Sequence, residues 1–316
     1  MTRAFVVERP GLLTTVQDLG RWGHQAAGVP VAGAMDTYSL RLANNLVGNL
    51  DSAASLEVTL LGPALRAASP LVVAVAGAVF DLTVNDRPVP HGAAVDVAAG
   101  AVLRFGERRA GTRAYLAVAG GVATPAVLGS RSTHLVSRMG GIDGRALASG
   151  DVVPIGTLAA PPARRATRTP LPVAPVPGEC RLRVLLGPQD DWFTTSSLDA
   201  LLGATFSVSP RSDRMGFRLD GPALMTRRPA ELVSEPVAFG ALQVPSGGAP
   251  ILLMADRQTA GGYPKIATVI TADLPLAGQL APGDAVRFAN CTRAEARSAL
   301  IARERDLLRA VPDGTR

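Results

Sequence analysis

The sequence predicts a mainly β protein made of two similar β units, and three observations indicate this fold class. Short apolar runs bounded by turn residues recur between Ser55 and Gly156, a spacing typical of a β-sandwich or barrel. The same pattern restarts after Glu179. Between the two lies a proline-rich stretch without hydrophobic periodicity, which is typical of an extended connection.

A chain of 316 residues is longer than one hydrophobic core usually serves, so we expect two domains. The first, residues 1–160, is a β domain with a helical entry segment. A linker with six prolines covers 161–179. The second domain, residues 180–316, is a β domain that ends in a helix.

Two pairs of segments indicate an internal duplication. Arg181–Leu186 precedes a Gly-Pro pair, as Leu56–Leu61 does, and Leu280–Val286 resembles Leu147–Val153 around a shared Gly-Asp pair. Asp151 and Asp284 in these Gly-Asp pairs are expected to form turns.

The elements follow in order along the chain. Phe5 begins a short strand that ends at a Pro-Gly turn, and a glycine-rich coil leads to a helix that starts at Asp36 or Thr37 and ends near Gly48. In the coil, Trp22 and His24 are expected to serve packing. The apolar runs of the first domain predict strands at Leu56–Leu61, Leu71–Val75, Phe80–Val84, Val95–Val97, Val102–Phe105, Tyr115–Val118 and Val152–Ile155.

Two helices are expected in the second domain. Leu198–Leu202 before a glycine predicts a short helix. Thr292 and Glu295 have the spacing of a capping box and predict the start of a C-terminal helix.

Composition excludes several classes of protein. The most apolar run, Leu71–Val79, has the length of a strand, and the first residues lack the apolar core of a secretory signal, so we expect a cytoplasmic protein without a membrane span. Cys180 and Cys291 are too far apart in sequence to form a metal or redox motif, and no metal is expected. The net charge is +6, yet the arginines are scattered and aromatic residues make up 4%, which disfavours nucleic-acid binding.

Lys265 is the single lysine of the chain, whereas the other 31 basic residues are arginines. A compact ammonium kept among so many arginines suggests a site that a planar guanidinium does not suit. Polar side chains surround it in sequence, and two glycines allow close approach of the backbone to a ligand: Asp256, Arg257, Gln258, Thr259, Gly261, Gly262 and Tyr263. The alternative is a lysine retained by chance on a surface loop.

Other polar stretches also exceed what folding alone requires. They are Gln17–Arg21, Leu128–Thr133, Ser212–Gly216 and Ser234–Pro236. Arg131 and Arg214 in these stretches suit either a ligand clamp or a structural ion pair. A nucleotide-binding P-loop is excluded, because the single lysine follows a proline rather than a glycine.

Taken together, the motifs Q-D-L-G-R-x-G, P-x-x-G-A-M-D, L-G-S-R-S-T, S-x-R-M-G-x-R-L-x-G, S-E-P-V-x-x-G-x-x-Q-V-P and D-R-Q-T-x-G-G-Y-P-K resemble the allophanate hydrolase subunit 2 family, also called the biotin-dependent carboxyltransferase family. The match runs in order over residues 5–290. It implies a fold of two tandem cyclophilin-like β-barrels. The family includes the C subunit of bacterial ATP-dependent 5-oxoprolinase, which stand-alone members of this length most resemble.

The resemblance implies a complex with two further proteins, the A subunit and the B subunit of 5-oxoprolinase, of which the latter is similar to allophanate hydrolase subunit 1. That complex hydrolyses the lactam 5-oxo-L-proline to L-glutamate and uses ATP, for which this chain has no P-loop. We expect Lys265 and Arg257 to stabilise a developing oxyanion or to bind phosphate and carboxylate groups, and Glu235 or Asp256 to act as general base. The expected substrate-binding residues are Arg257, Gln258, Thr259, Tyr263, Arg214 and Arg131.

Two alternatives remain open at this point. In a urea carboxylase, the chain is the second half of the carboxyltransferase, and biotin is carried by another chain, since Lys265 lacks the methionine neighbours of a biotinylated lysine. In a regulatory binding protein that antagonises a kinase inhibitor, Lys265 is a contact residue and catalyses nothing.

Overall fold

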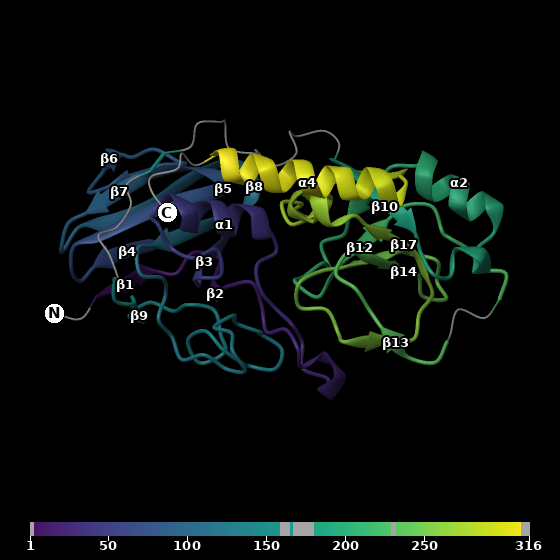
Figure 1. Cartoon of the computed structure of the whole chain (residues 1–316), viewed down its shortest axis with the longest axis horizontal. Helices are drawn as coiled ribbons and strands as arrows, with labels where there is room; N and C mark the ends of the chain where they lie inside the picture. Colours follow the sequence, from purple (N-terminus) through teal and green to yellow (C-terminus); the bar gives the residue numbers. More distant parts are fainter. Residues whose placement is uncertain (1–2, 159–164, 167–179, 229–231, 311–316) are drawn as a thin grey trace. The chain divides into compact units, whose positions relative to one another are not determined.

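The computed structural model describes residues 3–158, 165–166, 180–228 and 232–310. The chain forms two compact units (Figure 1), of which the first comprises residues 1–21, 32–174 and 305–316 and the second comprises 22–31 and 175–304. The linker expected at 161–179 lies outside the described residues, apart from Arg165 and Ala166.

The first unit contains one nine-stranded sheet. Its strands are paired in the order β2-β3-β8-β4-β1-β9, with β5 joined to β8 and carrying β6 and β7 on its other side. The strands are β1 (Ala4–Arg9), β2 (Leu13–Gln17), β3 (Ser55–Thr59), β4 (Ala64–Ala67), β5 (Leu71–Val84), β6 (Arg87–Pro88), β7 (Ala94–Val97), β8 (Val102–Val118) and β9 (Val152–Pro154).

Four of the apolar runs expected as separate strands merge into two long ones. β5 has 14 residues and β8 has 17, and they pair with each other over most of their length. Register shifts near Gly77 and Phe80 let the pair bend without ending, so the polar and glycine residues between the apolar runs are bulges rather than turns.

β5 is buried on both faces of the sheet. Leu71, Val73 and Val75 belong to one core cluster, whereas the alternate residues Val72 and Ala74 belong to a second cluster under α1 (Thr37–Leu46). Burial on both faces explains why this strand is a continuous apolar run. The predicted helix start is confirmed, because Asp36 Oδ1 accepts a hydrogen bond from the amide of Ser39 at 2.9 Å.

The second unit is built on a closed seven-stranded barrel, so the mainly β fold predicted from sequence is confirmed. The barrel is paired in the order β10-β17-β14-β15-β12-β11-β18, and a separate two-stranded sheet joins β13 to β16. These strands are β10 (Cys180–Leu186), β11 (Phe206–Val208), β12 (Gly216–Asp220), β13 (Glu235–Pro236), β14 (Ala241–Gln243), β15 (Ile251–Leu253), β16 (Ala260–Gly261), β17 (Lys265–Val269) and β18 (Ala285–Asn290).

The two Gly-Asp turns are equivalent in structure, as the predicted duplication requires. Asp151 accepts a hydrogen bond from the amide of Ala148, and Asp284 from that of Ala281, at 2.7 and 2.8 Å. Each turn precedes the last strand of its unit. The predicted correspondence between Arg181–Leu186 and Leu56–Leu61 is not matched by the strand pairing. The first segment lies in β10, which pairs with β17 and β18, whereas the second lies largely in β3, which pairs with β2 and β8.

The remaining helices of the described chain are five short ones and the 18-residue α4: η1 (Gln25–Ala27), η2 (Asp190–Trp192), α2 (Thr195–Gly203), η3 (Thr271–Asp273), α3 (Leu274–Ala277) and α4 (Arg293–Ala310). The capping box of α4 is confirmed, since Glu295 accepts from the amide of Thr292 at 2.7 Å and donates its own amide to the Thr292 hydroxyl at 3.2 Å. Trp22 is 59% exposed, so the expectation that it serves packing is wrong.

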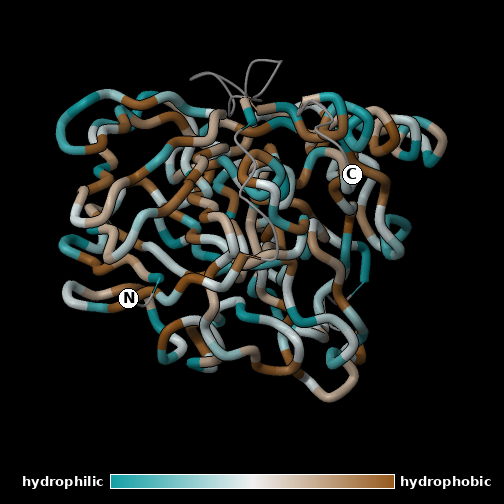
Figure 2. Tube along the Cα trace, turned by 60° about the vertical axis from the view of Figure 1, so that its left-hand side comes forward, coloured by the Kyte–Doolittle hydropathy of each residue, from teal (hydrophilic) through white to brown (hydrophobic). Residues whose placement is uncertain are grey.

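Hydrophilic residues gather in several outer turns of the trace, and hydrophobic residues are frequent in its inner parts (Figure 2). Within the described part of the chain, no helix is long and apolar enough to cross a membrane.

Candidate functional site

The segment from Met254 to Pro264 connects β15 to β17, two strands of the barrel. In its middle, β16 pairs with β13, and this pairing places Glu235 opposite Gly261. Two motifs that lie about thirty positions apart in sequence are thereby brought together, and Lys265 begins the strand that follows.

Lys265 and Glu235 form an ion pair at the start of β17. The lysine side chain is 6% exposed and that of Glu235 is 38% exposed. Gln189 joins both residues: its Oε1 accepts from the backbone amide of Lys265 at 3.1 Å, and its Nε2 donates to Glu235 Oε1 at 2.7 Å. An ammonium has three donors, and the described contacts of Lys265 Nζ use one of them. The lysine predicted from composition is therefore a nearly buried, charge-paired donor.

The hydrogen bond from Lys265, assisted by one from Gln189, lowers the pKa of Glu235 from its usual value of 4.5. A carboxylate whose pKa is depressed in the folded state stabilises that state above its unfolded pKa, and this contribution is lost as the pH falls through the folded pKa. We expect Lys265→Met to return the pKa of Glu235 toward 4.5, measured by carbon-detected NMR titration of the side-chain carboxyl. A pKa that stays depressed in this variant would show that Lys265 is not the cause.

Asp256 lies close by in sequence but is engaged elsewhere. Its two carboxylate oxygens accept hydrogen bonds from Arg214 Nε and Nη2 at 3.0 and 3.1 Å, and the side chains are 3% and 5% exposed. This bidentate pair ties the segment before β12 to the segment after β15. Of the two uses predicted for Arg214, a ligand clamp or a structural ion pair, this geometry corresponds to the ion pair.

Arg257 is a buried cation of a different kind. It is 7% exposed, donates to the carbonyls of Val237 and Met254 at 3.3 and 3.4 Å, and stacks over Phe239 at 5.5 Å. Burial lowers the pKa of Arg257 to about 10. Its partners among the described residues include no carboxylate, so its charge is suited to a ligand anion.

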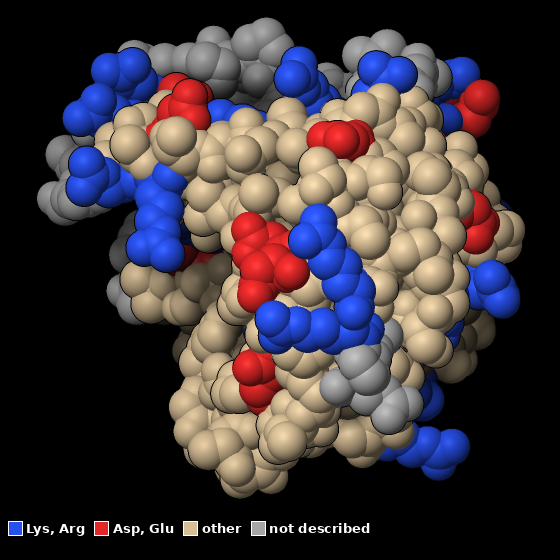
Figure 3. Space-filling view, turned by 90° about the vertical axis from the view of Figure 1, so that its right-hand side faces the viewer, with Lys and Arg blue, Asp and Glu red and all other residues tan. Residues whose placement is uncertain are grey.

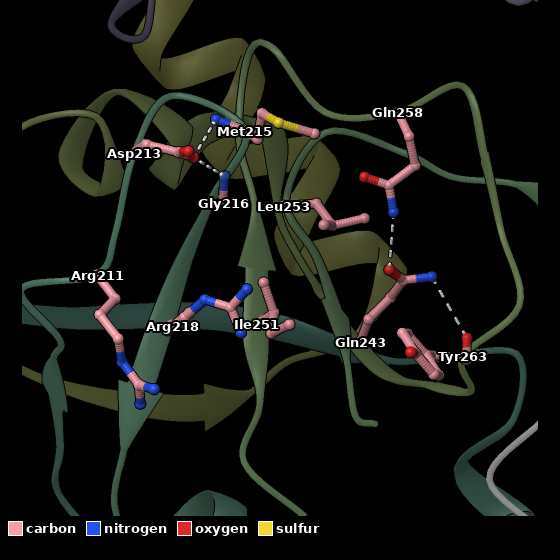
Figure 4. A pocket seen from close by; sticks show the side chains of 10 residues that line it. All are labelled: Arg211, Asp213, Met215, Gly216, Arg218, Gln243, Ile251, Leu253, Gln258 and Tyr263. Atoms are coloured by element: carbon pink, nitrogen blue, oxygen red, sulfur yellow. Dashed lines mark hydrogen bonds between the residues drawn. The ribbon is translucent and has the colours of Figure 1, made fainter. Parts of the chain in front are cut away.

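A depression of about 180 Å³ opens beside this segment (Figure 4). Two of the predicted substrate-binding residues, Gln258 and Tyr263, line it. Lys265 is not among the lining residues, but its cross-strand partner between β14 and β17, Gln243, is a third lining residue. The other lining residues are Arg211, Asp213, Met215, Gly216, Arg218, Ile251 and Leu253.

The remaining predicted site residues do not line this depression. Thr259 is half-buried, and its carbonyl accepts from the amide of Val237 at 3.2 Å. Arg131 belongs to the first unit, where its Nε donates to the carbonyl of Thr124 at 2.8 Å. Its amide donates to Asp18 at 2.6 Å, and this carboxylate also holds Ser130 and Ser132. The described contacts of the Leu128–Thr133 motif therefore brace two loops of the first unit.

Sequence reasoning missed four polar residues of the site: Gln189, Arg211, Arg218 and Gln243. Gln189 follows a Gly-Pro pair that indicates only a turn, and its partners lie 46 and 76 positions away. Gln243 lies within the motif S-E-P-V-x-x-G-x-x-Q-V-P, so its place in that motif is the one signal that identifies it.

Among the described residues, no group of three or more His, Cys, Asp or Glu side chains could hold a metal ion. Figure 3 shows the face of the molecule that includes the barrel, where basic side chains stand in separate groups, several of them beside acidic ones.

Comparisons with known proteins show which protein family this chain is similar to. A family model described as "Carboxyltransferase domain, subdomain A and B" matches residues 27–290. The chain is 39% identical to the 5-oxoprolinase C subunit of Escherichia coli (strain K12) and 37% identical to that of Haemophilus influenzae, covering 91% and 87% of each pair of chains. The crystal structure of the K. lactis urea amidolyase is 33% identical with a TM-score of 0.91, over 97% of this chain and 20% of that one.

Proposed function

Because this chain belongs to the carboxyltransferase domain family, subdomains A and B, we propose that it is the C subunit of a 5-oxoprolinase that hydrolyses 5-oxo-L-proline to L-glutamate. The observation that carries this proposal is the similarity to two proteins that bear this name, over nearly their whole length. The similarity to urea amidolyase, by contrast, covers a fifth of that much longer chain. The proposed partners are the A and B subunits of 5-oxoprolinase, and the chain acts only in their complex.

The proposed reaction adds water across the lactam C–N bond. The attacking oxygen bonds to the carbonyl carbon, the C–N bond breaks, and the ring nitrogen takes up a proton. Negative charge grows on the carbonyl oxygen during attack, and a fixed ammonium in a partly dry site stabilises that charge strongly. Lys265 suits this role because its side chain is 6% exposed and Glu235 takes one of its three donors.

Glu235 is the better placed of the two candidate bases. Both described hydrogen bonds to this carboxylate end on Oε1, and Oε2 accepts none from a described residue. The side chain is 38% exposed, so water can reach it. The carboxylate oxygens of Asp256, in contrast, are both held by Arg214. We assign Glu235 to the attacking water and Arg257 to a phosphate group rather than to the carboxylate of the substrate.

Opening a stable lactam at useful yield requires coupling to ATP hydrolysis, which we assign to the complex. The sequence of this chain has no P-loop, so we place ATP on one of the partner proteins.

A second candidate function is carboxyl transfer. The family description and the likeness to urea amidolyase favour it. In a carboxyltransferase, Lys265 and Arg257 bind the transferred carboxylate and stabilise the ureido oxygen of a biotin that another chain carries.

The experiment that separates the two functions begins with co-purification of the chain with the products of its neighbouring genes. We expect the complex to hydrolyse ATP faster in the presence of 5-oxo-L-proline, measured by phosphate release, and to form glutamate in equal amount. Urea with biotin and bicarbonate is the matched control. Stimulation by that mixture, without stimulation by 5-oxo-L-proline, would replace the proposal with the second candidate.

A further inference from the structure

Two glutamine side chains form a short chain of hydrogen bonds at the wall of the depression (Figure 4). Gln258 Nε2 donates to Gln243 Oε1 at 3.1 Å, and Gln243 Nε2 donates to the backbone carbonyl of Tyr263 at 3.4 Å. Gln243 is 1% exposed, whereas Gln258 is half-buried and borders the open space.

The backbone carbonyl fixes the direction of the whole chain. A carbonyl oxygen can only accept, so the end of Gln243 that faces Tyr263 must be its NH₂ group. Gln243 then presents its oxygen to Gln258, which must donate to it. Gln258 Oε1 is therefore the end that remains for a ligand, and it accepts no hydrogen bond from a described residue. The depression offers a hydrogen-bond acceptor whose identity is set by a buried neighbour.

Gly261 makes this arrangement possible. A Cβ at this position would lie 2.7 Å from Gln243 Nε2 and 3.1 Å from Gln258 Nε2. Any larger residue would push the two amides apart, which gives a local reason for the first glycine of the Gly-Gly pair.

The other lining residues define the rest of the ligand. Arg211 and Arg218 carry guanidinium groups that make no ion pair with a described residue, and the carboxylate of Asp213 is turned to the amides of Met215 and Gly216 at 2.8 and 3.2 Å. The lining is therefore positively charged beside an apolar wall of Ile251 and Leu253. The volume of about 180 Å³ is well below the roughly 300–1,000 Å³ of pockets for drug-sized ligands.

We propose that this depression binds a small cyclic amide that carries a carboxylate, with Gln258 Oε1 accepting the ring N–H and Arg218 binding the carboxylate. Gln243 is a positioning residue that fixes the direction of the Gln258 amide. The inference rests on the proposed function, because it places the substrate of that reaction in this site. The inference adds that Gln258 Oε1 is the atom that distinguishes a ring N–H from other ring members.

The test compares 5-oxo-L-proline with its lactone analogue, in which a ring oxygen replaces the N–H. An acceptor facing the ring rejects the lactone, since two oxygens would face each other without a proton. For the wild-type complex, we expect the lactone, added as inhibitor, to bind at least about tenfold more weakly than the lactam. Gln258→Met should raise KM for the lactam about tenfold and reduce the preference over the lactone to less than about threefold.

Matched variants separate the acceptor from its positioning. Gln258→Glu keeps an acceptor oxygen but loses the N–H that Gln243 Oε1 accepts, so it should reduce the preference. Gln243→Glu still accepts from Gln258 and should retain the preference, whereas Gln243→Leu frees the Gln258 amide to turn and should reduce it. Equal preference in the wild type and Gln258→Met would overturn the inference.

A failure of the proposed function can be distinguished from a failure of the proposed binding site. If the complex shows no turnover of 5-oxo-L-proline, binding of the lactam and the lactone to the full chain is measured by ligand-observed NMR. Selective binding of the lactam, lost in Gln258→Met, upholds the site without the reaction. Binding of neither compound, or of both equally, overturns the site as well.

Discussion

Replacing Lys265 with methionine is expected to lower kcat of the assembled complex by about 10²–10³-fold, the loss typical when one donor to a developing oxyanion is removed. Methionine keeps the apolar stem of a side chain that is 6% exposed, so packing in β17 is largely preserved. KM for 5-oxo-L-proline should change much less than kcat. The measurement is steady-state release of glutamate by the co-purified complex.

The control for this prediction is Lys265→Arg, which keeps the charge but replaces the compact ammonium with a planar fork. We expect it to retain assembly and to recover only a small part of the activity. Full activity of Lys265→Met, in a complex of unchanged composition by size-exclusion chromatography, would show that Lys265 takes no part in the chemistry. Loss of the complex itself would assign the lysine to assembly instead.

The Arg214→Met variant is expected to lose about 3–5 kcal/mol of unfolding free energy, the usual consequence of leaving one partner of a buried ion pair without its counter-charge. Asp256 is 3% exposed and both of its oxygens accept from Arg214, so neither water nor another described cation replaces the lost donors. The measurement is denaturant unfolding of the full chain, followed by a probe of the barrel.

The double variant Arg214→Met with Asp256→Leu is the control, because it removes both charges and leaves an apolar pair. We expect it to recover most of the lost stability. It also tests the role of Asp256. Near-normal turnover by a stable double variant would leave Glu235 as the general base, whereas a stable but inactive double variant would favour Asp256.

Part of the site can be predicted from sequence because the signal is local. Lys265 stands out as the single lysine, and its polar neighbours lie within ten positions. This cluster predicts Gln258 and Tyr263 as site residues, and both line the depression. Arg131, predicted from another motif, braces a loop of the first unit, because a motif alone does not tell which contacts an arginine makes.

Partners across long sequence separations could not be predicted in the same way. Gln189 lies 76 positions from Lys265, and Arg214 lies 42 positions from Asp256. Their contacts depend on the closure of the barrel and on strand register, where a shift by one residue would send every side chain to the other face.

The sequence by itself determined the mainly β class, the three principal helices, two of them with their caps, the Gly-Asp turns and the polar cluster around Lys265. Each of these depends on periodicity, capping or composition within a few residues. Only the tertiary structure decided that β5 and β8 are continuous, that Asp256 is bound by Arg214 while Glu235 meets Lys265, and that the buried Gln243, bound to the carbonyl of Tyr263, directs the amide of Gln258. These outcomes depend on which groups compete for a buried hydrogen-bond partner, and that competition is settled by the packing of distant segments.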